Sequence, residues 1–311
     1  MLIFQGISPH RAPKGGRAVT IGNFDGVHLG HRALIQRTVA VARDRQLTSA
    51  VVTFEPHPKA FFTPQQAPGK IQGLRAKAAL LADLGVDELW VCRFRRRLAQ
   101  MSAEDFMTRF LHRSMRTAEL VIGDDFRFGA KRRGDVEMLR QYGTSAGWIV
   151  QTIPTVLAGG ERVSSSRLRI ALAAGDLQGA EEIMGHPLFL CGHVVHGRKL
   201  GRDLGYPTLN IPVSNTLLIS GVFVVSVEGL GAAPIAAVAS LGHRPTVEQA
   251  GRLLLEVHLF DWHGDAYGKI VKVTFHEKLR DEARFDSLEA MTEQIHLDAQ
   301  QARLYFAHHA H

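Results

Sequence analysis

The stretch IGNFDGVHLGH, residues 21–31, decides the fold of the first half of the chain, because it joins a strand pattern to a helix pattern. It follows the apolar run 17–21 and leads into the helix-period segment 31–45. Gly22, Gly26 and Gly30 fall within nine residues, and glycines allow a tight turn and a close approach of the backbone to a ligand. Because the helix start directs N–H groups and the positive end of its dipole at this turn, the stretch predicts an anion site.

Two histidines in the same stretch strengthen the prediction. His28 and His31 stand three residues apart around Gly30, so both imidazoles can reach one point near the helix start and donate to phosphate oxygens. The stretch is not a Walker loop, and no GxGxxG follows a strand in this chain. For an isolated HxGH, a plain turn with capping histidines would be sufficient. The preceding strand together with Asn23 and Asp25 favours a phosphate site.

Outward from this stretch, strand and helix patterns alternate. Apolar runs at 17–21, 49–54, 88–91, 119–122 and 148–153 predict buried strands, and segments 31–45, 74–84, 103–112 and 135–142 predict helices. Such alternation predicts an α/β, Rossmann-like domain with a parallel sheet covered by helices on both faces. Two further helices, 165–174 and 177–184, end this half.

After Gly185 the pattern changes. β-rich runs at 188–196, 221–228, 234–241, 253–260 and 269–276 precede one helical segment, 287–306. This order predicts a small antiparallel β-barrel domain with a C-terminal helix. The charge balance changes at the same place, from +9 over residues 1–184 to −2 over residues 185–311. We therefore expect two domains, 1–184 and 185–311.

Composition narrows the class of protein. The 311 residues are 45% hydrophobic and 22% charged, as in soluble globular chains. No run of about 18 apolar residues predicts a transmembrane helix, and the N-terminus lacks a secretory pattern. Cys92 and Cys191 cannot form a disulfide framework, so a cytoplasmic location is expected. The basic clusters 93–97 and 131–133 are short, which favours a small polyanion over nucleic acid.

Three other polar segments of the first half follow or precede predicted elements. TFEPHP, residues 53–58, closes a strand at the edge where open α/β sheets bind ligands, although a proline-stiffened turn would look the same. In GDDFRFG, residues 123–129, the acidic pair is suited to bind a ribose or a metal, and the aromatic side chains are suited to stack on a ligand. The alternative is a loop that the two phenylalanines anchor in the core. Ser164 and Ser165 cap a helix in which Arg169, one turn later, can reach phosphate.

The second half has its own polar constellation. Residues 192–210 carry glycines suited to an arch over a polyphosphate, and Thr208 and Asn210 alternate onto one side of an extended segment, offering two oxygens to Mg²⁺. A glycine-rich turn with a polar rim is the plain alternative. Farther on, alternation places Glu256 and His258 on one strand face, where the carboxylate can accept a proton from a substrate hydroxyl or simply be exposed.

These motifs carry a family resemblance over almost the whole chain. GNFDGVHLGH, TFEPHP, GDDFRFGAKRRGD and VSSSRLR resemble the nucleotidylyltransferase module of bacterial bifunctional riboflavin kinase/FAD synthetases. GHVVHGRKLGRDLGYPTLN, LGHRPTV, LLEVHLFDWHGDAYGK and KLRDEARFDSLEAM resemble the riboflavin kinase module of the same family. The resemblance implies two reactions: riboflavin and ATP give FMN and ADP, and FMN and ATP give FAD and pyrophosphate. Val163, Ser166, Leu209 and His243 depart mildly from the usual pattern.

The resemblance also implies roles for individual residues. His28 and His31 hold the triphosphate, Arg169 the leaving pyrophosphate, and Glu256 is the general base, while Thr208 and Asn210 hold Mg²⁺-ATP. The remaining residues expected to bind ATP or its phosphates are Gly22, Asn23, Phe24, Asp25, Gly26, Gly30, Ser164, Ser165, Gly197, Lys199, Gly201 and Gly205. We expect the flavin at Asp125, Phe126 and Arg280.

The expected partners are therefore riboflavin, FMN, ATP and Mg²⁺, with neither nucleic acid nor membrane, and the oligomeric state stays open. Two alternatives remain: a relative with a single activity, and a tRNA- or nucleic-acid-related HxGH protein, which the basic first half favours. Against the second, the chain has no KMSKS-like lysine loop and its second half is mildly acidic. A metal-storage role for the sixteen scattered histidines is the weakest reading.

Overall fold

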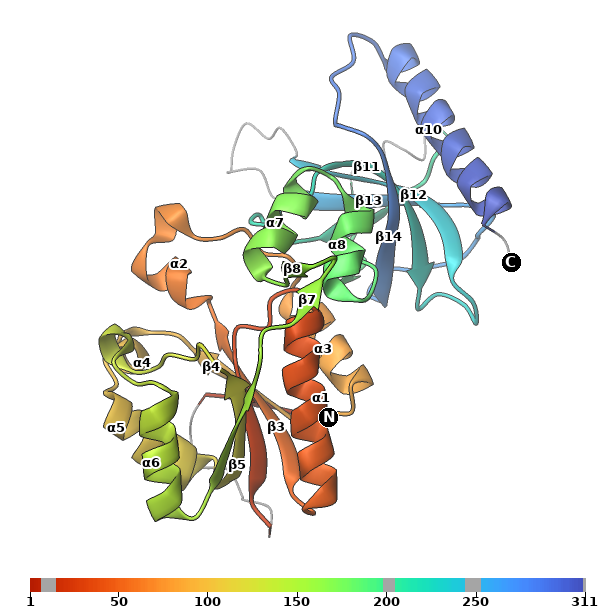
Figure 1. Cartoon of the computed structure of the whole chain (residues 1–311). Coiled ribbons are helices and arrows are strands. Elements are labelled where there is room, and N and C mark those ends of the chain that lie inside the picture. The colour runs from red at the N-terminus through yellow and green to blue at the C-terminus, as the bar shows by residue number, and fades with distance from the viewer. Residues whose placement is uncertain (7–14, 198–204, 244–252, 310–311) are drawn as a thin grey trace. The chain divides into compact units, whose positions relative to one another are not determined.

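The computed structural model describes residues 1–6, 15–197, 205–243 and 253–309 (Figure 1). These residues form two compact units. The first comprises Met1–Pro68 and Lys77–Ser164, and the second comprises Gly69–Ala76 and Ser165–His311.

The first unit is built on a parallel sheet, as its strand–helix alternation predicts. Its order is β1-β4-β3-β2-β5-β6, and every neighbouring pair is parallel. Because the order reverses at β2, the crevice at the carboxyl end of β2 is where open α/β sheets bind ligands. The strands are β1 Leu2–Gln5, β2 Arg17–Ile21, β3 Thr48–Glu55, β4 Glu88–Arg93, β5 Thr117–Gly123 and β6 Ile149–Ile153.

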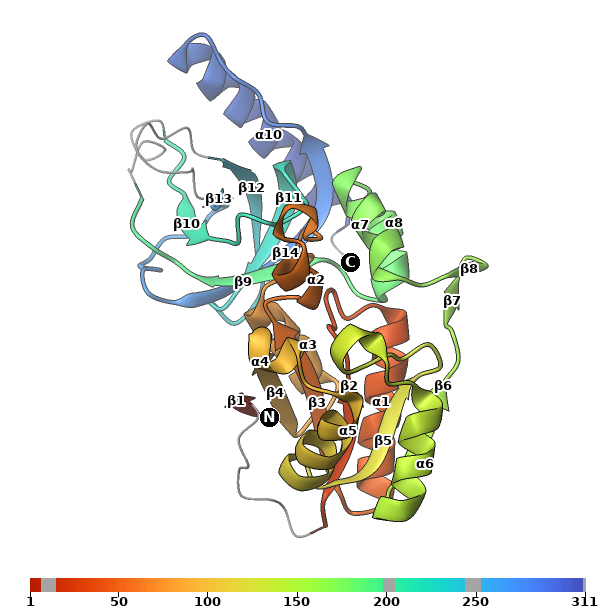
Figure 2. The same ribbon diagram turned by 90° about the vertical axis from the view of Figure 1, so that its left-hand side faces the viewer.

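Helices cover both faces of this sheet (Figure 2). Ala18 packs with Val41 and Ala42 of α1, whereas the next residue of β2, Val19, lies in the core that includes Phe106 and Phe110. Successive strand residues point to opposite faces, so one strand contacts both layers. The elements between the strands are α1 Leu29–Asp44, α2 Pro58–Phe62, η1 Pro64–Gln66, α3 Leu74–Asp83, α4 Arg96–Ala99, α5 Ala103–Asp105, η2 Phe106–Ser114, η3 Ala130–Arg132, α6 Val136–Ala146 and the hairpin β7 Leu157–Ala158 and β8 Glu161–Arg162.

The second unit is a six-stranded antiparallel sheet in the order β10-β13-β12-β11-β14-β9. Its two edges meet, because the Val195 N–H just after β9 donates to the Asn210 carbonyl in β10 at 2.8 Å, which closes the sheet into the predicted barrel. The elements are α7 Ser165–Ala173, α8 Leu177–Met184, β9 Phe189–His193, β10 Leu209–Pro212, β11 Gly221–Glu228, β12 Ile235–His243, β13 Leu253–Leu259, β14 Ile270–Arg280 and α10 Leu288–His308.

The outer face of the barrel carries the C-terminal helix α10 (Figure 1). Val222 and Val238 pack there with Ala299 and Ala302 of the helix. Two ion pairs fasten it: Arg280 binds Asp298 at 2.7 Å, and Arg303 binds Asp261 at 2.7 Å and holds the pKa of that carboxyl below its ordinary value.

Some elements differ from the sequence-based expectation. β1 is an exposed four-residue edge strand, too short for its alternation to be recognised. Residues 103–114 are a short α-helix followed by a π-helix, not one regular helix. β10 was not predicted: it has only four residues, and it begins at Leu209, at the end of the segment 192–210 that was interpreted as an arch over a polyphosphate.

The compact units also divide the chain differently from the predicted boundary. α7 and α8 group with the barrel, and so does the distant segment 69–76. Lys70 donates its backbone N–H to Thr216 at 2.6 Å, and Gly69 lies so close to Leu218 that a Cβ would be 2.3 Å from its side chain. A division of function between residues 184 and 185 stays a prediction.

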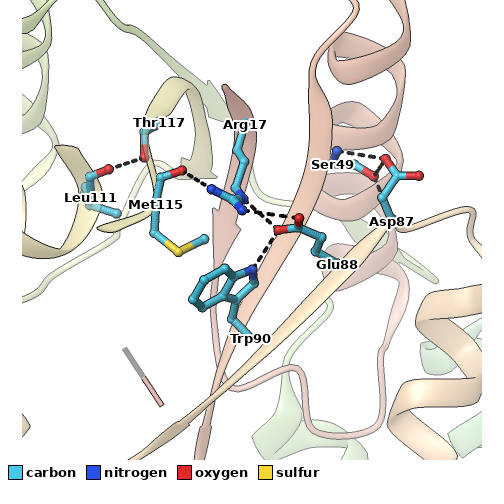
Figure 3. Close-up of polar contacts among 8 residues, drawn as sticks. All are labelled: Arg17, Ser49, Asp87, Glu88, Trp90, Leu111, Met115 and Thr117. Carbon is cyan, nitrogen blue, oxygen red and sulfur yellow. Dashed lines mark hydrogen bonds and ion pairs between the residues drawn. The ribbon is translucent and has the colours of Figure 1, made fainter. Parts of the chain in front are cut away.

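A buried ion pair joins the strands of the first sheet at the amino-terminal edge (Figure 3). Arg17, fully buried at the start of β2, donates to Glu88 at the start of β4 at 2.6 Å and to the Met115 carbonyl at 2.8 Å. The Trp90 indole N–H donates to the same carboxylate at 2.9 Å. All these donors and acceptors are satisfied by one another, which makes the removal of any single partner costly.

Glu88→Ala is expected to lower the free energy of unfolding by about 3–5 kcal/mol, because it leaves the guanidinium of Arg17 buried without its carboxylate. Urea denaturation of the full chain measures the change. Glu137→Ala, at an exposed position of α6, is the matched control and should change stability by less than about 0.5 kcal/mol. A loss at Glu88 no larger than at Glu137 would contradict the assignment of the pair as a stabilising element.

Candidate functional site

The loop 22–28 after β2 adopts a strained backbone. Phe24, Gly26 and Val27 have φ of +47°, +76° and +38°, the left-handed region that costs a β-branched residue most. Phe24 and Val27 are fully buried, so their packing holds this conformation. A Cβ on Gly22 would lie 3.0 Å from the Phe24 ring, so a larger residue there would press on that ring. Strain of this kind concentrates where a loop must present its backbone to a ligand.

The two histidines lie together at the start of α1. His28 is the N-cap, and its Nδ1 accepts the backbone N–H of His31 at 3.3 Å. The two rings stack with centroids 3.5 Å apart and planes 13° apart, and the Phe24 ring packs edge-on against His31 at 5.1 Å. Since Nδ1 of His28 accepts, a neutral ring carries its proton on Nε2, which makes Nε2 a donor. The structure thus brings both imidazoles to one point at a helix N-terminus.

Segments that follow other strands reach the same edge of the sheet. Gly30 lies against His28 and Val163, since a Cβ on Gly30 would be 3.4 Å from the His28 ring and 4.0 Å from the Val163 side chain. Val163, the residue before Ser164, therefore lies beside the first turn of α1. Asp125, two residues past β5, forms an exposed ion pair with Arg162 at 2.6 Å. Phe126 stacks on Phe128 with centroids 5.8 Å apart.

Two features of this edge were missed in the sequence. One is an aromatic cluster of Phe54, Phe61, Phe62 and Phe94, whose ring centroids lie 5.3–5.8 Å apart and of which Phe62 is 61% exposed. The adjacent phenylalanines after TFEPHP were the visible signal. The other is Lys77, which shares the buried face of α3 with Leu80 and Leu81. A lysine at an apolar helical position was its signal.

Arg169 lies in α7 of the second unit. Its Nε donates to the Gly69 carbonyl at 2.9 Å and its Nη1 to the Ser165 carbonyl at 3.1 Å. The guanidinium therefore binds the segment 69–76 to the helix that opens the second unit. Its predicted contact with the leaving pyrophosphate stays a prediction.

Three of the residues expected to bind substrates or to act as base, Asn210, Glu256 and Arg280, stand in one row across the barrel. Asn210 of β10 pairs with Glu256 of β13, Glu256 with Ser240 of β12, Ser240 with Val222 of β11, and Val222 with Arg280 of β14. Directly paired residues of an antiparallel sheet point to the same face, so the row lies on the outer face that α10 contacts. Along β13, buried and half-buried residues alternate strictly, which confirms that Glu256 and His258 share one face.

The turn before β10 is held by hydrogen bonds of this row. The amide nitrogen of buried Asn210 donates to the Thr208 carbonyl at 3.3 Å, and Nδ1 of His258 donates to the Pro207 carbonyl at 3.0 Å. A Cβ on Gly197 would be 2.4 Å from the Asn210 amide, so any larger residue there would displace the Asn210 side chain. Gly205 has a φ of +85°. Lys199 and Gly201 lie outside the described residues.

Arg280, a predicted flavin residue, is bound to a buried carboxylate of the second unit. Its guanidinium makes a two-point contact with Asp298 and lies 5.7 Å from the centroid of the Phe285 ring. The strand β14 continues to Arg280, so the base of this side chain is held by the sheet. Arg280 thereby anchors α10 to the row that contains Glu256.

Comparison with known proteins identifies what the two halves are similar to. The family model for FAD synthetase matches residues 10–167, and the model for riboflavin kinase matches residues 184–306. The chain is 44% identical over 298 residues to the bifunctional riboflavin kinase/FMN adenylyltransferase of Escherichia coli K12, covering 95% of each chain. It is 42% identical over 312 residues to the protein of the same name from Pseudomonas fluorescens, covering 100% of both.

A solved structure has the same fold over nearly the whole chain. It is described as a macrolide-efflux protein from Streptococcus pneumoniae, with a TM-score of 0.80, 29% identity and coverage of 97% of this chain and 99% of that one.

Within its described ranges, the present chain has no helix that is both long and apolar enough to cross a membrane.

Proposed function

The chain belongs to the family of bifunctional riboflavin kinases/FMN adenylyltransferases, and we propose how its own residues carry out the two reactions. It converts riboflavin to FMN and FMN to FAD, with ATP consumed at each step. We assign adenylylation to residues 1–184 and phosphorylation to residues 185–311. The matched ranges and the two separate constellations of polar residues support this assignment.

The observation that supports the kinase assignment best is the row across the barrel. Glu256 accepts the proton of the ribityl 5′-hydroxyl as that oxygen attacks the γ-phosphorus of ATP, and ADP leaves. Arg280 is three strands away on the same face, and strands lie about 4.8 Å apart, so the two side chains are separated by about 14 Å along the sheet. We propose that the hydroxyl end of the flavin lies at Glu256.

The nucleotide of the kinase reaction is placed beside the base by the turn before β10. Thr208 and Asn210 offer hydroxyl and amide oxygens, the donor set that Mg²⁺ accepts in proteins. Because the amide nitrogen of Asn210 donates to the Thr208 carbonyl, the amide oxygen is the atom that would bind a cation. A bound Mg²⁺ would neutralise charge on the β- and γ-phosphates. The glycines Gly197, Gly201 and Gly205, with Lys199, are proposed to cover the phosphates.

The adenylyltransferase reaction needs no protein nucleophile. The FMN phosphate oxygen attacks the α-phosphorus of ATP in line, the bond to the β-phosphate breaks, and pyrophosphate leaves. Catalysis then consists of positioning and charge stabilisation. His28 and His31 donate to the triphosphate from the N-terminus of α1, and the backbone of the strained loop 22–28 approaches the phosphates. Arg169 is proposed to bind the leaving pyrophosphate.

A place for the FMN ring is suggested by the aromatic side chains of the first unit. The exposed ring of Phe62 and its neighbours Phe61 and Phe94 offer an apolar face at the end of β3, while Phe126 and Asp125 follow β5. Stacking on aromatic faces stabilises a planar tricyclic ring, and a carboxylate can accept from its polar edge.

We propose riboflavin, FMN and ATP as the ligands, a cytoplasmic setting, and no role for nucleic acid or membrane.

The direct test is to incubate the chain with riboflavin, ATP and Mg²⁺ and to separate riboflavin, FMN and FAD by chromatography. Both products are expected. FMN without FAD, or FAD only from supplied FMN, would identify a relative with one activity. Quenching of flavin fluorescence with no salt-dependent RNA binding would exclude the nucleic-acid alternative.

The kinase activity is expected to survive in a fragment. Residues 185–311 should fold, bind riboflavin and make FMN but no FAD. Residues 165–311 should be more stable in urea, because α7 and α8 bury Leu168, Leu172 and Ile183. A fragment 185–311 that folds cooperatively by circular dichroism but makes no FMN would contradict the assignment of the kinase to this part.

A further inference from the structure

Lys77 places a buried ammonium group directly against loop 22–28, the loop proposed to bind the phosphates of ATP. The residue is 5% exposed, and its Nζ donates to the Asn23 carbonyl at 2.7 Å and contacts the Thr53 hydroxyl at 3.2 Å. Thr53 in β3 donates its own hydroxyl to the same carbonyl at 3.0 Å. One carbonyl of the loop is therefore bound by side chains of two other elements, α3 and β3.

Binding this carbonyl fixes the peptide that opens the strained part of the loop. In a planar trans peptide the C=O and the N–H point in opposite directions, so the N–H of Phe24 is directed away from Lys77 and Thr53. Phe24 is the first of the left-handed residues, and its ring supports His31. Release of the carbonyl would let the peptide rotate, and the positions of the Phe24 N–H and of His31 would no longer be determined.

The group that binds this carbonyl carries a positive charge. Taking an ammonium group out of water is unfavourable unless it is hydrogen-bonded, and here it donates to the Asn23 carbonyl. A positive charge next to a loop that receives a triphosphate does more, because it attracts the anion while it orients the backbone.

We propose that Lys77 is a positioning residue of the adenylyltransferase site, which holds the Asn23–Phe24 peptide in the orientation that presents the loop to the triphosphate of ATP. The inference rests on the proposed assignment of this loop to ATP. It predicts that the kinetic effects of changing Lys77 and Thr53 are not additive, since both side chains act through a single carbonyl.

The test is steady-state kinetics of both reactions on the full-length chain. Lys77→Met should lower kcat for FMN adenylylation about 10²-fold, the size expected when reacting groups lose their alignment, with the KM for FMN unchanged. Thr53→Val should give a smaller loss in the same direction. The double variant should lose no more than Lys77→Met alone, because the peptide is already released. Riboflavin phosphorylation by the same molecules is the internal reference.

Arg109→Met is the matched control, because it removes a positive charge from an exposed side chain of the same unit and should leave both activities unchanged. Losses at Lys77 and Thr53 that multiply, or a fully active Lys77→Met, would overturn the role of Lys77. Should Lys77→Met fail to fold by circular dichroism, Thr53→Val carries the test, and unchanged kcat there would overturn it. A wild-type chain that makes no FAD from FMN would instead contradict the proposed function.

Discussion

Glu256→Gln is expected to lower the rate of FMN formation from riboflavin by about 10²–10⁴-fold, the usual contribution of a general base. Glutamine keeps the shape and the place of the side chain between Asn210 and Ser240 but cannot accept the proton of the ribityl hydroxyl. Because the change affects only the transfer step, kcat and kcat/KM should fall together while riboflavin still binds.

The same molecules provide the first control for this variant. Adenylylation of supplied FMN should be unaffected, since it depends on the first unit. Glu228→Gln, which alters an exposed carboxylate of β11 that pairs with Lys272, is the matched change on the same sheet and should leave both activities intact. A joint fall of both activities in Glu256→Gln would mean that Glu256 is structural or that the two sites are coupled.

His31→Ala is expected to lower FAD formation from FMN by about 10²–10³-fold while riboflavin phosphorylation continues. The substitution removes one preorganised donor from the developing charge on the triphosphate, and such donors are worth this much in related sites. It also removes the ring that stacks on His28 at 3.5 Å and that Phe24 supports. Chromatographic measurement of FAD from FMN and ATP determines the loss.

His112→Ala is the matched control for this prediction, because His112 is an exposed histidine of the same unit that contacts only the ring of Tyr142 among the aromatic side chains described. Its FAD formation should equal that of the wild type. If His31→Ala makes FAD at the wild-type rate, the imidazole has no part in the reaction, and the anion site must depend on the backbone of loop 22–28 and on His28.

Much of the fold follows from local patterns. The run 17–21 is β2 to the residue, and the alternation of residues 253–259 appears as alternating burial in β13. The helix that starts beside GNFDGVHLGH, the C-terminal helix and the barrel strands other than β10 were predicted, and the parallel sheet and the barrel are confirmed. These features depend on side chains a few residues apart, whose period of 2 or 3.6 determines which face can be buried.

The predicted sites divide in the same way. HxGH and the alternation that includes Glu256 are local signals, and both are where the patterns indicated. Lys77 and the aromatic cluster were missed, because their meaning depends on Asn23, Thr53 and Phe94, which lie far from them in the chain. Arg280 was expected at the flavin, but its contact with Asp298 of α10 could not be foreseen.

Local sequence therefore accounts for where strands, helices and the strained glycine-rich turn occur, since steric limits on the backbone and side-chain periodicity act over short distances. Only the tertiary structure decides the strand order, the closure of the barrel through Val195 and Asn210, and the row that joins Asn210, Glu256 and Arg280. It also decides that segment 69–76 belongs with the barrel. These arrangements depend on which distant surfaces exclude water together and on which buried donors find acceptors, and neither is encoded within one short stretch of chain.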